Sequence, residues 1–381
     1  MQQTLIVKVQ LYPSAEDALI LQSTMHAYVQ ACDWLSTQAF NRSVYKAKEL
    51  QKLYYQTLRS KFGLKAQMAI SVTRTVSAKY QTVKEQLKAE PVRYDQYTFK
   101  RNLEWLQNPI CFKGRFVDLV RERDWSFKQN VLSLNTLQGR VEVAYNIHTN
   151  RGLLNKDWHF GTGTIHKVRD KWYFYIPVSI DTPDGTAFNH VVGIDRGIKN
   201  IIYTYDGAGN SIAFNGEILQ AKRQKFQRTR KSLQSKNTKG AKRLLKRIAG
   251  RENRWMNDVN HCLSKTLVNA YETNTAFVLE DLSKISYKTH KGKDLNYSIS
   301  SWAFYDFEQK LIYKAQLKQG KVIHVNPHNT SIQCPLCRHV DKNARNRKAS
   351  LYTCKKCGFA ANDDLVGAMN IYQRGVAQLN T

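Results

Sequence analysis

The chain has 381 residues, which suits two to four structural units, and 42% of them are hydrophobic. Its 59 lysines and arginines outnumber 30 acidic residues, and the resulting charge of +29 favours a polyanionic partner, most commonly nucleic acid. No run of about 18 apolar residues could cross a membrane, and the apolar run near the N-terminus is too short for a signal peptide. We therefore expect a soluble, intracellular protein.

The N-terminal segment predicts a strand followed by helices. Apolar and polar residues alternate over Leu5–Leu11, which indicates a strand. The pattern Pro13-Ser14-x-x-Asp17 is a capping box that predicts a long helix reaching about Phe40. Further helical patterns cover residues 44–62 and 64–87, so we expect a helical segment that ends near residue 105.

From about residue 110 the sequence predicts short strands. Residues 131–134, 141–145, 163–167 and 172–180 are rich in β-forming residues and are separated by turn residues. A small barrel or sandwich is the simplest interpretation, and the N-terminal strand may be part of it. The turn at residues 181–188 ends this unit.

A second unit alternates strands and helices. Strands are predicted at residues 191–195, 200–205 and 211–214, with Asp206-Gly207 supplying the hairpin turn between the last two. Helices at 255–271 and 302–319, buried strands at 276–279 and 322–325, and a final helix starting near Asp364 follow. This order indicates an α/β domain.

A basic segment lies between Lys222 and Arg254, with fourteen lysines and arginines and one acid, Glu252. Such runs are often only solvated faces. The apolar residues between the charges favour packed helices with one side facing nucleic acid. The candidate contacts are Lys222, Arg223, Lys225, Arg228, Arg230, Lys231, Lys242, Arg243, Lys246 and Arg247.

Four of the seven cysteines form two CxxC pairs, Cys334/Cys337 and Cys354/Cys357, and this spacing predicts a zinc ribbon held by four thiolates. We expect one structural Zn²⁺ ion there, although direct base recognition by the ribbon stays open. Five basic residues of the ribbon could also touch nucleic acid: Arg338, Lys342, Arg345, Arg347 and Lys348. The isolated Cys32, Cys111 and Cys262 are expected to be buried free thiols.

Acidic residues follow two apolar strands and begin the last helix. Asp195 and Glu280 end their strands, where ligands of an α/β sheet usually bind. Carboxylates gathered there would repel one another unless cations neutralised them, and Mg²⁺ or Mn²⁺ prefers such oxygen ligands. Two bridged ions can hydrolyse a phosphodiester, which in a basic protein indicates nucleic-acid cleavage.

Helix periodicity separates the two adjacent acids of the last helix. Asp364 shares a face with Ala368 and Ile371, so we expect it to point toward the sheet, whereas Asp363 should cap the helix or face solvent. The same choice between Glu280 and Asp281 is left open by spacing, which favours Glu280 only slightly.

The chain resembles the TnpB family, the insertion-sequence-encoded ancestors of type V CRISPR effectors. The resemblance rests on GIDRG at 193–197, LEDL at 279–282, the CxxC pairs and DLVGAMN at 364–370. It extends to LYPS at 11–14, the strand at 172–178, His261-x-x-Ser264 and Thr330-Ser331, and so covers nearly the whole chain.

The resemblance implies a multidomain α/β and β protein. A β-barrel wedge-type domain would comprise residues 1–12 and 106–187, with a helical recognition domain, residues 13–105, inserted in it. An RNase H-like (RuvC) nuclease domain would occupy residues 188–330 and 360–381, and the zinc ribbon, residues 331–359, would interrupt it.

The resemblance also implies an RNA-guided DNA endonuclease in which Asp195, Glu280 and Asp364 hold two Mg²⁺ or Mn²⁺ ions. Its partners would be a guide RNA from the transposon end and double-stranded target DNA beside a short motif. It would be cytoplasmic in a prokaryote and nucleoid-associated, with no membrane and no protein oligomer required.

Two positions depart from the family pattern. Arg338 follows the second cysteine, where many members have glycine, and Asn362-Asp363 replaces an often-seen His-Arg before Asp364. Neither change removes an expected ligand, and all three acids are present, which favours an intact nuclease. The alternatives are a guide-RNA-dependent DNA-binding protein that does not cut, and a transposase that uses the same acids.

Overall fold

The computed structural model describes residues 2–89, 92–94, 97–147, 158–181, 188–197, 199–282 and 304–380. The chain divides into two compact units, Gln2–Asp181 and Thr182–Thr381. Within the described ranges, no helix has both the length and the apolar character that a bilayer span requires.

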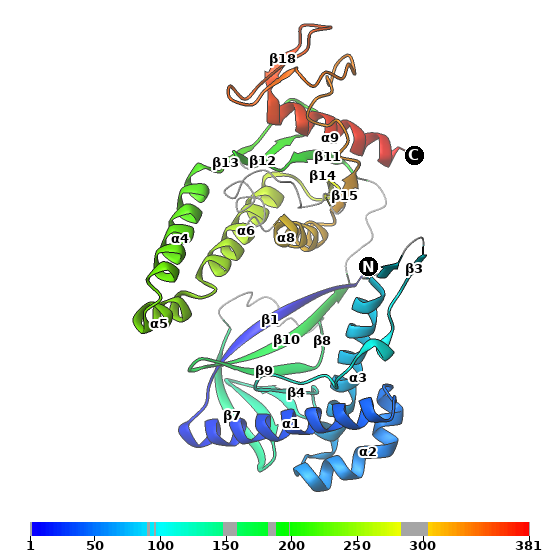
Figure 1. Ribbon diagram of the computed structural model, residues 1–381, viewed down its shortest axis with the longest axis vertical. Coiled ribbons are helices and arrows are strands. Elements are labelled where there is room, and N and C mark those ends of the chain that lie inside the picture. The colour runs from blue at the N-terminus through cyan, green and yellow to red at the C-terminus, as the bar shows by residue number, and fades with distance from the viewer. Residues whose placement is uncertain are drawn as a thin grey trace. The chain divides into compact units, whose positions relative to one another are not determined.

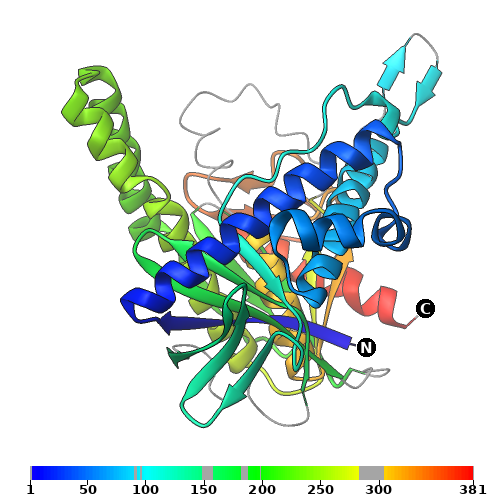
Figure 2. The same ribbon diagram turned by 90° about the horizontal axis from the view of Figure 1, so that it is seen from below.

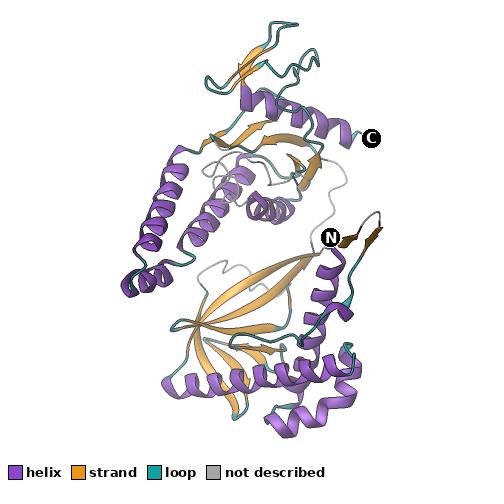
Figure 3. Cartoon of the chain, in the orientation of Figure 1, coloured by secondary structure: helices purple, strands orange, loops and turns teal. Residues whose placement is uncertain are grey.

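The first unit combines a curved antiparallel sheet with three helices (Figure 3). Hydrogen-bonded neighbours follow the order β4-β9-β10-β1-β7-β6-β5, with β8 paired to β10. Its elements are β1 (Gln2–Tyr12), α1 (Ala15–Asn41), α2 (Ala47–Phe62), α3 (Ala66–Ala89), β2 (Val92–Tyr94), β3 (Tyr97–Phe99), η1 (Leu103–Trp105), β4 (Phe116–Leu119), β5 (Trp125–Lys128), β6 (Val131–Thr136), β7 (Gly139–Asn146), β8 (His159–Phe160), β9 (Gly163–Val168) and β10 (Lys171–Asp181).

The sequence locates most of these elements correctly. The strand β1 lies between β10 and β7, as a member of the sheet, and the Ser14 hydroxyl accepts the backbone N–H of Asp17 at the start of α1. Among the described residues the sheet is an open half-barrel, which agrees in part with the expected small barrel or sandwich. The short strands β2, β3, β4, β5 and β8 were not anticipated.

The helices and the sheet of the first unit share one hydrophobic core. Alternate residues of β1 and β10, such as Val9 and Phe174, are buried together with Met25 of α1 and Val72 of α3. The split of this unit into wedge and recognition domains therefore remains a prediction, because a common core joins the two parts.

The second unit is built on a five-stranded sheet with the order β13-β12-β11-β14-β15. Strands β11, β14 and β15 are parallel, whereas β12 and β13 are antiparallel to their neighbours. Its elements are β11 (His190–Asp195), β12 (Asn200–Tyr205), β13 (Ala213–Asn215), α4 (Glu217–Lys236), α5 (Lys239–Ile248), α6 (Arg251–Ala270), β14 (Thr275–Glu280), α8 (Phe304–Leu317), β15 (Lys321–Val325), β16 (Arg345–Asn346), β17 (Leu351–Thr353), β18 (Ala360–Asn362) and α9 (Asp363–Leu379).

Helices cover both faces of this sheet (Figure 1). Ile194 and Leu279 pack with residues of α6 and α8 on one face, and α9 crosses the other. The crossing is close because glycines face it: a Cβ atom at Gly193 would lie 2.3 Å from the Ala368 carbonyl oxygen. Helices α4, α5 and α6 form an arm beside the sheet (Figures 1 and 2).

Two local predictions are corrected. Asp206 and Gly207 lie in the link between β12 and β13 as expected, but β13 begins only at Ala213, and within this longer link Asp206 Oδ1 accepts the backbone N–H groups of Ala208 and Asn210. Cys32 is buried as expected, but Cys111 and Cys262 are exposed. Cys262 lies on α6 but off the face that buries Met256, Asn260 and Leu267, and Cys111 lies outside any helix or strand.

Candidate active site and zinc ribbon

Two of the predicted acids end adjacent parallel strands. In the register of β11 and β14, Ile194 lies opposite Leu279, so Asp195 and Glu280 follow at the same edge of the sheet. Strand β14 is buried along its length as far as Leu279, and exposure begins at Glu280. The carboxyl ends of these strands therefore carry carboxylates where the apolar core stops.

The third acid reaches this edge through α9. Gly367 lies one helical turn after Asp364, and a Cβ atom there would be 2.7 Å from Asp195 Oδ2. A larger side chain at this position would have to displace the Asp195 carboxylate. The Asn362 side chain caps the helix by accepting the backbone N–H groups of Asp364 and Leu365, at 3.0 and 3.2 Å.

Asp364 is held through both of its carboxylate oxygens. Asn200 Nδ2 donates to Oδ2 at 2.9 Å, and Arg345 Nη2 donates to Oδ1 at 3.1 Å. Arg345 also donates through Nε to Asp363 Oδ2 at 2.6 Å. The expectation that Asp363 caps α9 or faces solvent is therefore wrong: its side chain is 5% exposed and paired with the ribbon.

Glu280 is held by groups from outside its strand. The Thr330 hydroxyl, at the root of the ribbon, donates to Glu280 Oε1. The buried guanidinium of Arg196 donates to the Glu280 carbonyl oxygen at 2.7 Å and to Glu308 Oε2 at 2.8 Å. These contacts fix the end of β14 relative to β11 and α8.

Two of the acids, Asp195 and Asp364, lie in an environment that disfavours their charged forms. Burial, followed by the charges of Glu280 and Asp364, raises the pKa of Asp195 to about 8. Burial also raises the pKa of Asp364, against the hydrogen bond from Asn200 and the charge of Arg345. A divalent cation would relieve this repulsion, and carboxylate oxygens suit Mg²⁺ or Mn²⁺.

The carboxylates are less tightly gathered than the cysteines. Among the described histidine, cysteine and acidic residues, four thiols form a group whose ligand atoms all lie within 4.8 Å of one another, and the three carboxylates do not meet that limit. A pair of ions about 3.5–4 Å apart does not require every ligand to touch one centre. The donor set and the electrostatics suit divalent cations.

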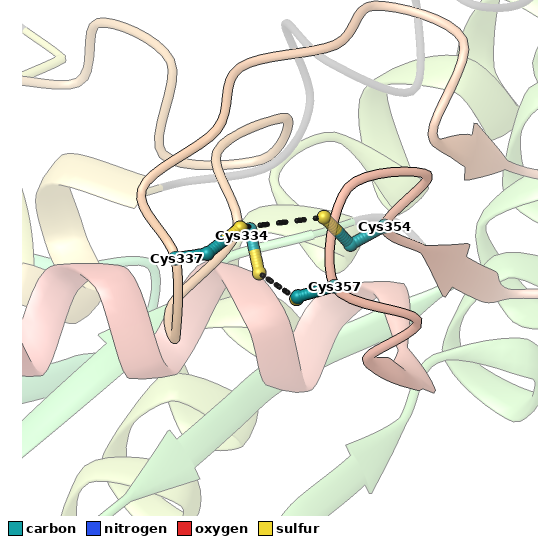
Figure 4. Close-up of side chains that lie close together, drawn as sticks. All are labelled: Cys334, Cys337, Cys354 and Cys357. Atoms are coloured by element: carbon teal, nitrogen blue, oxygen red, sulfur yellow. Dashed lines mark hydrogen bonds between the residues drawn. The ribbon is translucent and has the colours of Figure 1, made fainter.

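The cysteine group has the geometry of a zinc site (Figure 4). The Sγ atoms of Cys334 and Cys357 are 3.6 Å apart, as are those of Cys337 and Cys354. Zn–S bonds of about 2.3 Å in a tetrahedron place sulfur atoms roughly 3.8 Å apart. The backbone N–H groups of Cys357 and Lys356 lower the pKa of the Cys354 thiol, which favours the thiolate that zinc binds.

The two halves of the zinc site are similar backbone turns. Arg338 N–H donates to the Cys334 carbonyl oxygen, and Gly358 N–H donates to that of Cys354, both at 3.0 Å. Both residues have a left-handed backbone conformation, with φ of 61° at Arg338 and 75° at Gly358. Arginine therefore occupies a conformation that favours glycine, which explains the usual glycine at this position.

Most of the predicted nucleic-acid contacts are exposed on α4 and α5, with two exceptions. Arg223 is 4% exposed, so its prediction as a surface contact is wrong. Arg230 is half-buried and pairs with Glu252 at 2.8 Å. The exposed residues are Lys222, Lys225, Arg228, Lys231, Lys242, Arg243, Lys246 and Arg247.

Sequence reasoning missed the groups that hold the acids. Asn200 carries no local signal, because nothing in its neighbourhood along the chain links it to Asp364, 164 positions later. Arg345 was assigned to nucleic acid with the other ribbon cations, since nothing in a linear pattern pairs it with residues eighteen and nineteen positions later. Thr330 was noted only as part of a family motif.

Two family models match the second half of the chain. One, described as "Probable transposase", matches residues 175–288. The other, described as "Cas12f1-like, TNB domain", matches residues 304–371. Together they include all three acids and the four cysteines.

Solved CRISPR effectors have a similar fold. A Cas12f1–sgRNA–target DNA complex covers 98% of each chain with a TM-score of 0.52 and 13% identity. CasPhi-2 (Cas12j) bound to crRNA covers 97% of this chain and 98% of its own, with a TM-score of 0.56 and 11% identity. These identities show a likeness of fold alone.

Curated relatives are more similar in sequence. The endodeoxyribonuclease Cas12f1 of Sulfoacidibacillus thermotolerans is 28% identical over 54% of this chain and 51% of its own length. Putative RNA-guided DNA endonuclease InsQ of Escherichia coli is 29% identical over 57% of each. The chain thus spans little more than half of these two relatives. A TnpB-like protein of Methanocaldococcus jannaschii is 30% identical over 197 residues, 49% of this chain and 69% of that protein. The chain therefore belongs to the TnpB family.

Proposed function

We propose that this chain is a transposon-encoded, RNA-guided, Mg²⁺-dependent DNA endonuclease that cleaves double-stranded DNA beside a short adjacent motif. The observation that carries the proposal is the meeting of Asp195, Glu280 and Asp364 at one sheet edge, where the pKa of Asp195 rises to about 8. The names of Cas12f1 and InsQ as endonucleases support the reaction class.

The three carboxylates would hold two Mg²⁺ or Mn²⁺ ions. When bound, such a pair activates a water molecule and stabilises the leaving oxygen of a phosphodiester. The chain's own residues orient the ligands: Asn200 holds Asp364, and the Thr330 hydroxyl holds Glu280. Asp364 and Glu280 are thus each restrained by a hydrogen bond from outside their own element, as metal-binding carboxylates generally are.

The strand order of the second unit supports an RNase H-like (RuvC) nuclease domain. An antiparallel hairpin pair, β12 and β13, flanks the parallel strands β11, β14 and β15. We assign residues 188–330 and 360–381 to this domain and residues 331–359 to the ribbon, with a structural zinc ion. The first unit would provide the wedge domain and its helical recognition insertion.

The proposed nucleic-acid partners are a guide RNA from the transposon end and target DNA. Lysines and arginines exposed on α4 and α5 offer a basic surface for phosphates. In the first unit, a cavity of about 730 Å³ between α3 and β4 is lined by Arg74, Lys79 and Lys113 beside Phe112 and Phe116. This cavity is our candidate for contact with the adjacent DNA motif. We also propose that the protein acts at the nucleoid.

The proposal is tested with the full chain and the RNA that copurifies with it. Sequencing that RNA gives the guide, and a plasmid with the matching target is then incubated with the complex and Mg²⁺. We expect cleavage by the wild type and loss of cleavage in Asp195→Ala. Asp258→Ala, which removes an exposed acid from α6, is the matched control and should cleave normally. If the plasmid stays equally intact with wild type and with Asp195→Ala, the proposed nuclease activity is refuted.

One observation favours a second candidate, a transposase, because the family model over residues 175–288 carries that description. The same acids would serve strand transfer, so the reaction products separate the two activities. Free DNA ends support the nuclease, whereas transposon ends joined to target DNA support the transposase.

A further inference from the structure

The ribbon meets the proposed active site through one arginine. Arg345 lies on β16 with its side chain 20% exposed, and its guanidinium contacts both acids at the start of α9. Nε lies 2.6 Å from Asp363 Oδ2, and Nη2 lies 3.1 Å from Asp364 Oδ1. One cation is therefore shared between two neighbouring carboxylates.

Asp363 is the principal partner of this cation. Its contact with Arg345 is the shorter one, and its side chain is 5% exposed against 12% for Asp364. The second oxygen of Asp363, Oδ1, is buried and accepts no hydrogen bond from the described part of the chain. A buried carboxylate depends on such a counter-charge, so Asp363 needs Arg345.

Asp364 has other support. Its Oδ2 accepts the hydrogen bond from Asn200, and it lies at the sheet edge beside Asp195. Lys199 also acts on its charge, but this ammonium is exposed and donates to the Ser350 hydroxyl. The buried group of one arginine and two aspartates keeps one net negative charge. Without Asp363 it would be neutral.

The position of Arg345 depends on the zinc ribbon. Arg345 pairs with Tyr352 in the β16–β17 ladder, and Thr353 N–H donates to the Ala344 carbonyl oxygen at 2.8 Å. Tyr352 is fully buried, and Cys354 follows it two residues later. The strand that places the guanidinium is thus the strand that enters the second cysteine pair.

We propose that Asp363 is a positioning residue for the divalent-ion site: it offsets the charge of Arg345, so that the group formed by Arg345, Asp363 and Asp364 presents a net negative charge to a cation. The inference rests on the proposed function in one respect, since it takes Asp364 as an ion ligand. A simple anchor between ribbon and α9 would need the same ion pair but would leave ion affinity unchanged.

The test is a titration of the full chain with Mn²⁺, in which electron paramagnetic resonance reports the free ion. Asp363→Asn should bind Mn²⁺ about 10- to 100-fold more weakly than wild type, the range typical for loss of an outer partner. Removing both charges in Asp363→Asn/Arg345→Gln should return the affinity close to that of wild type. If the ion pair is only an anchor, neither variant should differ from wild type in its Mn²⁺ affinity.

Asp341→Asn is the matched control, because Asp341 lies in the ribbon and pairs with Lys355 at 3.7 Å, away from the acids. Its Mn²⁺ affinity should equal that of wild type. Zinc content and melting temperature show whether each variant keeps its ribbon. If Asp363→Asn loses zinc, the Mn²⁺ affinity of Arg345→Gln is measured instead. An affinity at least equal to that of wild type supports the inference, and a weaker affinity overturns it.

The outcomes separate the inference from the proposed function. Unchanged affinity in a folded Asp363→Asn, or a double variant as weak as the single one, overturns the inference while wild type still binds Mn²⁺ and Asp195→Ala does not. If wild type binds no more Mn²⁺ than Asp195→Ala, both the proposed site and the inference are overturned.

Discussion

Asp195 is a carboxyl group surrounded by two others at the end of β11. Burial and the charges of Glu280 and Asp364 favour its protonated form, and the pKa rises to about 8, although Arg345 and the Arg196 N–H oppose this change. In the unfolded chain the group returns to about 3.8. Between these values the folded protein binds the proton that the unfolded chain has lost.

This difference predicts how stability changes with pH. Without added Mg²⁺, the free energy of unfolding should fall as pH rises from about 4 to about 8, because native Asp195 holds more protons than unfolded Asp195. Asp195→Asn removes the ionisation and should flatten this decline. Urea unfolding at a series of pH values measures it, with the exposed Asp258→Asn as control. Parallel curves for wild type and Asp195→Asn would contradict the assignment.

For single residues, helix periodicity correctly predicted that Asp364 points toward the sheet, but it wrongly predicted that Asp363 caps the helix or faces solvent. The period of an isolated helix shows which residues share a face, and it treats every other face as solvent. Here the ribbon covers the first turn of α9 and brings Arg345 against Asp363. A contact made by a separate element leaves no trace in the local pattern, so the burial of Asp363 could not be predicted.

The ribbon is the element that joins β15 to α9. Asn370 Nδ2 donates to the carbonyl oxygens of Thr330 and Gln333, both at 2.8 Å, and Gln373 Nε2 donates to that of Pro335 at 3.0 Å. These bonds hold the first cysteine turn against the helix. The second cysteine pair, Cys354/Cys357, lies a few residues before α9. Zinc binding to the four cysteines should therefore fix where that helix begins.

Breaking the zinc site should destabilise the second unit. In Cys354→Ser we expect zinc to fall well below about one ion per chain and the melting temperature to drop, because structural zinc contributes directly to folding free energy. Metal analysis and calorimetry measure both. The matched control is Cys262→Ser, which changes an exposed cysteine on α6. Wild-type zinc content and melting in Cys354→Ser would disprove the ribbon.

Elements with several periods were predictable, and short ones were not. The long helices α1 and α3 and the strands β1, β10 and β14 lie where alternation, capping or apolar runs place them. Strands β4 and β5 have four residues each, too few to establish a period. That the half-barrel is open also escaped prediction, because closure depends on pairing between distant strands rather than on any one segment.

At the scale of the whole molecule, charge and motif order predict nucleic acid as the class of partner. The chain carries a charge of +29, yet three of its acidic residues, Asp195, Glu280 and Asp364, lie at one edge of the sheet. Lysines and arginines cover α4 and α5, outside that edge. A basic protein with a local acidic site is suited to bind nucleic acid and to hold divalent ions against it.

The account is tested most directly by locating the ions. Crystals of the chain soaked with Mn²⁺ would be measured at the manganese absorption edge. We predict two anomalous peaks roughly 3.5–4 Å apart, at coordination distance from carboxylate oxygens of Asp195, Glu280 and Asp364. Manganese bound elsewhere, with none at these three side chains, would contradict the account.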